Sequence, residues 1–200
     1  SNFQFPIKSQ LPITNYQIAD PFNGQQDIEN KIIRAVGNPS GRFNEDALRL
    51  MRAVRFAAQL DFSAGGGPAS GWEIEPATES AVKSQANLLK MIAHERIRDE
   101  LVKIIESNNP EKGIMLMHEL GLLKIVLPEL EEGMGVAQNL HHIYTVFEHS
   151  VKSLGFAARY GYGAEVRFAS LLHDIGKPRT KGGEGPSATF YGPEYVGCKM

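Results

Sequence analysis

The sequence predicts a mainly α-helical protein with a small β-containing segment at its N-terminus. Two observations lead to this prediction. From residue 42 onward, apolar residues recur every three or four positions, which is the spacing of one face of a helix, and Gly or Pro separates the segments. Near the start, Phe3, Phe5 and Ile7 occupy alternate positions, as in a half-buried strand. We divide the chain into regions 1–38, 39–135 and 136–200.

Turn residues and capping residues place the individual elements. Residues 37–41 are rich in Gly, Asn and Pro and mark the first boundary. A long helix is predicted from Asn44, which can cap its N-terminus, while Glu45 and Asp46 suit the positive end of the helix dipole. Beyond the glycine-rich loop at 64–71, helices are expected near 76–90, 94–107, 111–121, 142–160 and 164–174.

Composition narrows the classes of function. The 200 residues carry a formal net charge of -2, so the chain lacks the basic excess of a general nucleic-acid binder and would need local clusters to contact RNA. The single cysteine, Cys198, rules out an internal disulfide and suits a reducing cytoplasm. No run reaches the roughly 18 apolar residues of a membrane span. We therefore expect a cytoplasmic protein without a membrane partner.

Asp46 and Arg49 have side chains that could read a nucleobase. They lie three positions apart on the helix predicted from Asn44, so their side chains would be neighbours. A carboxylate accepts hydrogen bonds and a guanidinium donates them, which matches the amino group and ring nitrogen of cytosine and adenine. Uracil and guanine would leave buried polar groups without hydrogen-bond partners, and each such group would weaken binding by about 1–3 kcal/mol. The same spacing also fits a surface ion pair worth under about 1 kcal/mol, and Arg52 and Arg55 fit surface charges or phosphate contacts equally.

A second cluster contains histidines. His149 lies on the helix predicted for 142–160, and His173 and Asp174 lie at the end of the apolar helix predicted near 164–174. Two imidazoles and a carboxylate suit a divalent ion that generates hydroxide for attack on a phosphoester. The alternative interpretation makes His173 a C-terminal helix cap and Asp174 a turn residue.

Longer motifs resemble a known family. Residues 20–28, D-P-F-N-G-Q-Q-D-I, resemble the D-P-F-G-G-x-x-D-L motif that closes the head domain of class II tRNA nucleotidyltransferases. Residues 42–60 resemble the E-D-x-x-R motif of that family and the L-R-A-x-R-F-A run that follows it, and residues 95–97 resemble its E-R-I motif. The family includes CCA-adding enzymes and bacterial poly(A) polymerases.

The resemblance implies roles for these residues. In the family, the Asp and Arg of E-D-x-x-R read the base of incoming CTP or ATP, and these correspond to Asp46 and Arg49. Glu95 and Arg96 then support the helices around the nucleotide pocket. The resemblance also implies that region 39–135 is a helical neck that reads the base and binds RNA, and that tRNA, CTP and ATP are the partners.

The resemblance also implies what the chain lacks. Region 1–38 would be the C-terminal end of the nucleotidyltransferase head. The carboxylates that bind Mg²⁺ and catalyse transfer belong to motifs expected before residue 1. We therefore expect no catalytic residue in this chain, and no nucleotide transfer by these 200 residues alone.

Residues 171–178, L-L-H-D-I-G-K-P, resemble the HD superfamily. Region 136–200 would then be the start of an HD domain, incomplete at residue 200, with His149, His173 and Asp174 as candidate ligands of a divalent metal. Pro193 stands where relatives carry a histidine, so contacts of that histidine are lost and a metal-free structural HD domain is an alternative. Three functions stay open: an RNA nucleotidyltransferase, an HD phosphohydrolase acting on 2′,3′-cyclic or 2′-phosphate ends, and a non-catalytic RNA-binding protein.

Overall fold

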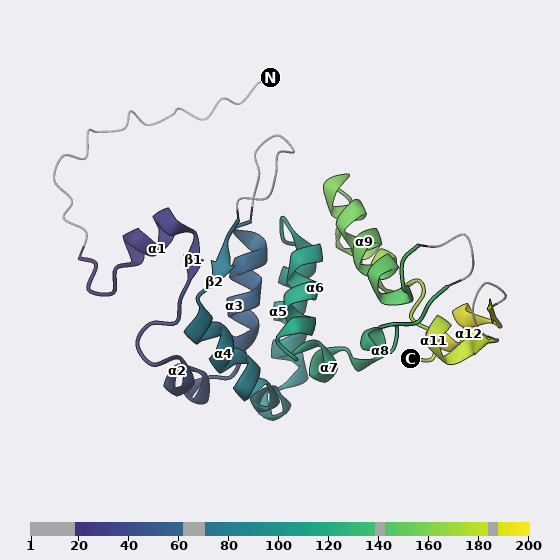
Figure 1. Ribbon diagram of the computed structural model, residues 1–200, viewed down its shortest axis with the longest axis horizontal. Helices are drawn as coiled ribbons and strands as arrows, with labels where there is room; N and C mark the ends of the chain where they lie inside the picture. Colours follow the sequence, from purple (N-terminus) through teal and green to yellow (C-terminus); the bar gives the residue numbers. More distant parts are fainter. Residues whose placement is uncertain (1–18, 62–70, 139–142, 184–187) are drawn as a thin grey trace, which may run out of the picture.

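The computed structural model describes residues 19–61, 71–138, 143–183 and 188–200, and it is mainly helical, which confirms the predicted fold class (Figure 1). The strand pattern predicted for Phe3, Phe5 and Ile7 lies outside the described residues. The helices of the first half are α1 (Gly24–Asn30), α2 (Pro39–Glu45), α3 (Leu48–Gln59), α4 (Pro76–Gln85) and the 3₁₀ helix η1 (Ala86–Met91). Those that follow are α5 (His94–Ile105), α6 (Pro110–Glu119), α7 (Leu123–Val126), α8 (Pro128–Glu131), α9 (Val146–Arg159), α10 (Ala164–Leu172), α11 (Lys177–Thr180) and α12 (Pro193–Gly197).

Two short β-ladders complete the described fold. Strand β1 (Ile32–Ile33) pairs in parallel with β2 (Glu73–Ile74), and this ladder holds the N-terminal segment against α3. Strand β3 (Lys181–Gly182) pairs antiparallel with β4 (Thr189–Phe190) beside α11 and α12. Among the described residues, no helix has the length and apolar character to cross a membrane.

The turn before α1 shows how the D-P-F-N-G sequence folds. The Asp20 carboxylate accepts hydrogen bonds from the backbone N–H groups of Gly24 and Gln25, at 2.7 and 2.9 Å. Asn23 has a φ of 57°, in the left-handed region, which Asn tolerates better than most residues. Asn at the place of the first family glycine is therefore compatible with this turn.

The helix predicted from Asn44 is in fact two helices, so that part of the prediction is wrong. Helix α2 begins earlier, because the Asn38 side chain accepts hydrogen bonds from two backbone N–H groups of the first turn and Pro39 occupies the first helical position. Asn44 lies inside α2. Asp46 then adopts an extended backbone (φ -152°, ψ 102°) that ends α2, and its Oδ1 accepts the backbone N–H of Leu48 at 3.1 Å to start α3. Asp46 and Arg49 consequently do not share one helix.

Helices α3, α5 and α6 form the centre of the molecule and pack side by side (Figure 1). The core face of α3 is fully buried, at Leu50, Met51, Val54, Ala57 and Ala58. The apolar residues of α5 at helical spacing, Ile97, Leu101, Ile104 and Ile105, are likewise all buried. Apolar spacing therefore predicts correctly which sides of these helices meet.

Helices α9 and α10 pack against each other next to α6 and α5. Helix α9 begins at a capping box, in which Thr145 and Glu148 exchange side-chain and backbone hydrogen bonds. Arg167 on α10 donates to the backbone carbonyls of Ile105 and Ser107, at 3.0 Å each, at the C-terminal end of α5. This arginine fixes α10 to the central helices, since the last carbonyls of a helix have no partner within the helix.

Candidate functional site

A cavity of about 230 Å³ lies beside α2, α3 and β1 and has several basic residues in its lining. The basic lining residues are Arg34, Arg42, Arg49 and Arg52, and two aromatic residues, Phe43 and Phe56, accompany them. Guanidinium groups bind phosphate and carboxylate oxygens, and aromatic faces stack on planar rings. The cavity therefore suits a ligand that is both anionic and aromatic.

Arg49 is held firmly at the wall of this cavity, which we call the arginine pocket. Its Nη1 donates to Glu45 Oε2 at 2.6 Å and to the carbonyl oxygen of Arg42 at 2.9 Å. Arg42 also contacts Glu45, at 2.8 Å. The hydrogen bond from Arg49 lowers the pKa of Glu45, so this carboxylate stays charged beside both arginines. Arg49 is thus positioned before any ligand binds.

Asp46 does not line the arginine pocket and has other partners. Its Oδ2 lies 3.3 Å from Nη2 of Arg96, in the first turn of α5. The backbone N–H of Arg49 donates to the carbonyl of Asp46 at 3.1 Å, but the two charged groups bind different residues. The structure therefore places Asp46 and Arg49 one turn apart without bringing them into an ion pair with each other.

Glu95 and Arg96, which the resemblance assigns to helix support, both lie exposed in the first turn of α5. Arg96 connects α5 to the corner between α2 and α3 through Asp46. Its contact with Asp46 is long, at 3.3 and 3.5 Å. A long contact between exposed groups is weak, so it can be exchanged for a ligand at little cost.

Arg52 and Arg55 have opposite environments. Arg52 is exposed, lines the arginine pocket, and makes no hydrogen bond or ion pair with the described residues. Arg55 points inward, and its Nε lies 2.8 Å from Oε2 of Glu100, whose side chain is 3% exposed. The two atoms meet as an ion pair rather than as a well-aligned hydrogen bond. The prediction that Arg55 is a surface charge or a phosphate contact is therefore corrected.

Glu100 is the residue that sequence reasoning missed. It lies on the buried face of α5, between Ile97 and Ile104. A carboxylate at a core position requires a cationic partner, and this signal was available in the apolar spacing of α5. Arg55 supplies one partner from α3, and the partly exposed Lys103, also on α5, supplies a second at 3.1 Å from Glu100 Oε1.

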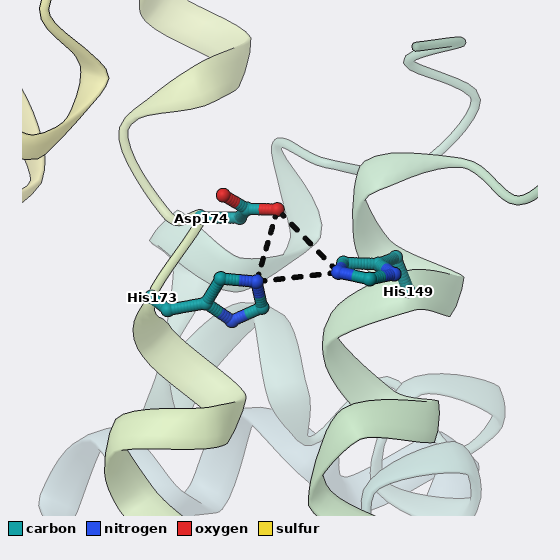
Figure 2. A group of neighbouring side chains, drawn as sticks. All are labelled: His149, His173 and Asp174. Atoms are coloured by element: carbon teal, nitrogen blue, oxygen red, sulfur yellow. Dashed lines mark hydrogen bonds and ion pairs between the residues drawn. The ribbon is translucent and has the colours of Figure 1, made fainter. Parts of the chain in front are cut away.

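His149, His173 and Asp174 come together as predicted (Figure 2). The Nε2 atoms of the two histidines are 3.2 Å apart. Asp174 Oδ2 lies 3.1 Å from His173 Nε2 and 3.8 Å from His149 Nε2. His149 comes from the start of α9, while His173 and Asp174 follow α10, so the packing of these two helices assembles the cluster.

These three side chains fit a divalent cation. Two ligand atoms at about 2.1 Å from one ion, at roughly tetrahedral or octahedral angles, are about 3.0–3.4 Å from each other. The distance between the histidine nitrogens and the distance from His173 to Asp174 both fall in this range, while the 3.8 Å from His149 to Asp174 is longer than it. Nδ1 of His173 bonds to the carbonyl of Ser170 at 2.9 Å, which leaves Nε2 of the neutral ring as the ligand atom. Pro193 begins α12 and offers no ligand.

Lys177 and Gln138 complete the surroundings of Asp174. The Nζ of Lys177 lies 2.8 Å from Asp174 Oδ2 and 2.8 Å from Gln138 Oε1. Burial alone would raise the pKa of Asp174, but hydrogen bonds from His173 and Lys177 outweigh it and lower the pKa to about 2. The bond to Asp174 in turn raises the pKa of His173, partly opposed by burial.

Replacing Asp174 with asparagine should destabilise the metal-free protein most between about pH 4 and 6.5. The pKa of Asp174 falls from 3.8 to about 2 on folding, so its contribution is present above pH 3.8 and is lost as the pH falls toward 2. The pKa of His173 rises on folding, so its contribution is full below pH 6.5 and is lost as the pH rises through the folded value. Urea unfolding at a series of pH values, with a chelator present, measures the free energy of unfolding of the variant and of the unchanged protein. A loss of stability that does not depend on pH would contradict the pairing of Asp174 with His173.

Family comparisons match two parts of the chain. Residues 71–134 match a family described as a probable RNA and SrmB-binding site of polymerase A. Residues 146–200 match the HD domain family. The first match covers β2 to α8 and the second covers α9 to the end of the chain.

Individual proteins are similar over a longer stretch. An A-adding tRNA nucleotidyltransferase of Deinococcus radiodurans is 37% identical in an alignment of length 193 that covers 92% of this chain and 42% of that protein. A CCA-adding enzyme of Ligilactobacillus salivarius is 46% identical over 108 residues, which are 54% of this chain and 24% of that protein. A crystal structure of the Bacillus stearothermophilus CCA-adding enzyme in complex with CTP has a TM-score of 0.54 and 32% identity, covering 80% of this chain and 35% of that one. The chain thus spans less than half the length of these relatives.

Proposed function

The chain belongs to the CCA-adding enzyme family, and from this we propose that the full-length protein is a nucleotidyltransferase that adds C and A to the 3′ end of tRNA from CTP and ATP. The observation that carries the proposal is the arginine pocket, in which Arg49 is held in place by Glu45 and Arg52 has no partner among the described residues. A similar CCA-adding enzyme has been crystallised with CTP, which supports a nucleotide as the ligand of this pocket.

In the proposed mechanism, Arg49 and Asp46 select the base. Arg49 donates hydrogen bonds to the acceptor atoms on the base edge, and Glu45 fixes the direction of its guanidinium. Asp46 accepts the hydrogen bond of the amino group that cytosine and adenine share, and gives up its long contact with Arg96 to do so. Uracil and guanine offer a carbonyl at that place, so they would leave the carboxylate facing another acceptor.

The residues that line the pocket besides Arg49 bind rather than select. The guanidinium of Arg52, which pairs with none of the residues that the structure describes, is available to phosphate oxygens, and Phe56, which lines the same wall, offers an aromatic surface. We assign no step of the transfer itself to residues of this chain, because the resemblance places the carboxylates that hold Mg²⁺ outside it. The residues described here bind and orient the nucleotide.

The remaining parts of the proposal concern partners and regions. We propose that region 39–135 is the neck that reads the base and contacts tRNA, which the family match at 71–134 supports. Region 1–38 would be the end of the nucleotidyltransferase head and region 136–200 the start of the HD domain, which the match at 146–200 supports. A reaction on tRNA in a chain with one cysteine suits the cytoplasm.

An incorporation assay tests the proposed function. The full-length protein is incubated with tRNA that lacks its 3′ CCA and with each labelled nucleoside triphosphate in turn. We expect C to be added, followed by A, with U and G incorporated at least about tenfold less efficiently, as loss of one buried hydrogen bond predicts. Addition of A only to tRNA that already ends in CC would indicate an A-adding enzyme, and long A tails would indicate a poly(A) polymerase. Equal use of all four nucleotides would contradict base selection by Asp46 and Arg49.

A second candidate function is favoured by the cluster in Figure 2. We propose that His149, His173 and Asp174 hold a divalent cation and that the HD domain hydrolyses phosphoesters such as 2′,3′-cyclic or 2′-phosphate ends. A cation held by these three residues would activate a water molecule for attack on the phosphoester. This activity differs from the first in needing neither CTP nor ATP, and the two can coexist in one protein.

A further inference from the structure

We propose that Gln138 is a positioning residue for the His149–His173–Asp174 cluster. Its side chain connects the residue that holds Asp174 to the start of α9, the helix that carries His149. The inference rests on the second candidate function, in which the cluster holds a divalent cation. It goes beyond that function because Gln138 is not one of the three ligands and lies outside every motif found in the sequence.

The cluster depends on how two helices lie relative to each other (Figure 2). His149 is in the first turn of α9, whereas His173 and Asp174 follow α10. The three ligand atoms lie within 4.8 Å of one another. A metal site has to hold its side chains to within roughly 0.5 Å of the right positions. A small shift of the start of α9 would therefore remove His149 from an ion that His173 and Asp174 hold.

Gln138 contacts both sides of the cluster through its amide group. Its Oε1 accepts a hydrogen bond from Nζ of Lys177 at 2.8 Å, and its Nε2 donates to the backbone carbonyl of Tyr144 at 3.3 Å. Lys177 also donates to Asp174 Oδ2 at 2.8 Å. Tyr144 directly precedes Thr145, the N-cap of α9. A continuous chain of hydrogen bonds thus runs from the carboxylate of Asp174 to the start of the helix that carries the first histidine of the cluster.

The backbone next to Gln138 is itself attached to the start of α9. Ala137 and Thr145 form an antiparallel β-bridge, and the backbone N–H of Val146 donates to the carbonyl of Val136 at 3.0 Å. Gln138 is only 6% exposed, and both polar ends of its amide have protein partners, so its side chain has one favoured orientation. Gln138 therefore keeps its position relative to α9 and transmits that position to its hydrogen-bond partner on α11.

Lys177 is equally fixed on the other side of this connection. It begins α11, which packs against α12, and its side chain is mostly buried. There is no room for a side chain at the preceding Gly176, because an added Cβ would collide with the carbonyl oxygen of Pro193 at the start of α12. A carboxylate oxygen has two lone pairs, so Asp174 Oδ2 can accept from Lys177 and bind a cation at the same time. Hydrogen bonds of this kind orient ligand carboxylates in metal sites.

Hydrogen exchange of the full-length protein tests the connection in the absence of metal. Gln138→Met keeps the size of the side chain but neither hydrogen bond. With a chelator present, it should raise the exchange rate of the backbone amides in residues 144–149 roughly fivefold, as the loss of a hydrogen bond predicts. Gln138→Glu is the second variant, because its carboxylate can still accept from Lys177 but cannot donate to the carbonyl of Tyr144. It should also raise exchange at the start of α9, and it replaces Gln138→Met if circular dichroism shows that the latter is unfolded.

Titration of the same full-length proteins with Co²⁺, followed by visible absorption, tests the effect on the cluster. The absorption that His173→Ala removes identifies the ion bound at this site. We expect Gln138→Met to lower the Co²⁺ affinity of the site about tenfold, as for the loss of other partners that orient metal ligands. The spectrum of the bound ion should shift toward that of His149→Ala, because His149 is the ligand that moves away. A general loss of stability would instead lower the melting temperature and leave that spectrum unchanged.

Gln85→Met is the matched control. Gln85 is a partly buried glutamine at the end of α4, and its amide donates to the carbonyl of Ser40 and to Asn44, in a part of the molecule remote from α9 (Figure 1). The control should leave the exchange of residues 144–149 and the Co²⁺ spectrum unchanged. Unchanged exchange at residues 144–149, or an unchanged Co²⁺ affinity and spectrum, in the Gln138 variants would each overturn the role of Gln138 while the metal site stands. If the unchanged protein shows no Co²⁺ absorption that His173→Ala removes, the metal site is overturned and the proposal with it.

Discussion

Replacing Arg49 with alanine in the full-length protein should lower kcat/KM for CTP and ATP by roughly 10- to 100-fold, since loss of a buried, charge-assisted hydrogen bond costs about 1–3 kcal/mol and each 1.4 kcal/mol is tenfold. Arg49 lines the pocket and is already oriented by Glu45 and by the carbonyl of Arg42. The fold should survive, because the contact with Glu45 is solvent-exposed and such pairs contribute little to stability. Selection of C over U should weaken together with the rate.

Steady-state incorporation into tRNA lacking its 3′ CCA measures this effect, with each of the four triphosphates assayed separately. Arg98→Ala is the matched control, because Arg98 is exposed and its only ion pair within the described part of the chain is with its neighbour Asp99. The control should keep both the rate and the preference for C over U. If Arg49→Ala adds C and A over U and G as selectively as the unchanged enzyme, Arg49 does not read the base, whatever happens to the overall rate.

The spacing of apolar residues was sufficient to predict which faces of the central helices are buried. The buried faces of α3 and α5 follow directly from apolar residues at helical spacing, since burial of those residues stabilises the packed helices. The start of α3 was not predictable in the same way. Asn38 and Asn44 are equally good caps, and only the structure shows that the first begins a separate helix and that Asp46 begins the next.

The residues of the candidate sites also differ in whether the sequence could predict them. His173 and Asp174 are adjacent in sequence and carry a specific motif, so the cluster with His149 could be predicted. The partners that decide how these sites behave are distant in sequence. Arg96 reaches Asp46 from 50 residues away, and Gln138 holds Lys177 from 39 residues away. Sequence spacing cannot give such contacts, because they depend on how whole helices pack.

Removing the carboxylate of Glu100 should lower the free energy of unfolding of the chain by about 3–5 kcal/mol, because it leaves Arg55 as an uncompensated charge in the interior. The side chains of Glu100 and Arg55 are 3% and 15% exposed, and their ion pair joins α5 to α3. Urea unfolding of Glu100→Ala measures the loss. Asp99→Ala is the control, because the neighbouring Asp99 is exposed, and its cost should stay below about 1 kcal/mol.

The double variant Arg55→Met with Glu100→Leu measures how much the intact ion pair contributes to the free energy of unfolding. Glu100→Ala alone measures instead the penalty for leaving Arg55 unpaired. Replacing both charges with apolar groups of similar size leaves no buried charge, so we expect the double variant to lose much less stability than Glu100→Ala. The same comparison bears on function, because α3 carries Arg49 and Arg52 as well as Arg55. If the pair positions α3, Glu100→Ala in the full-length protein should raise KM for CTP, and the double variant should restore it in part. A Glu100→Ala protein as stable as the unchanged one would show that water or another group already compensates Arg55.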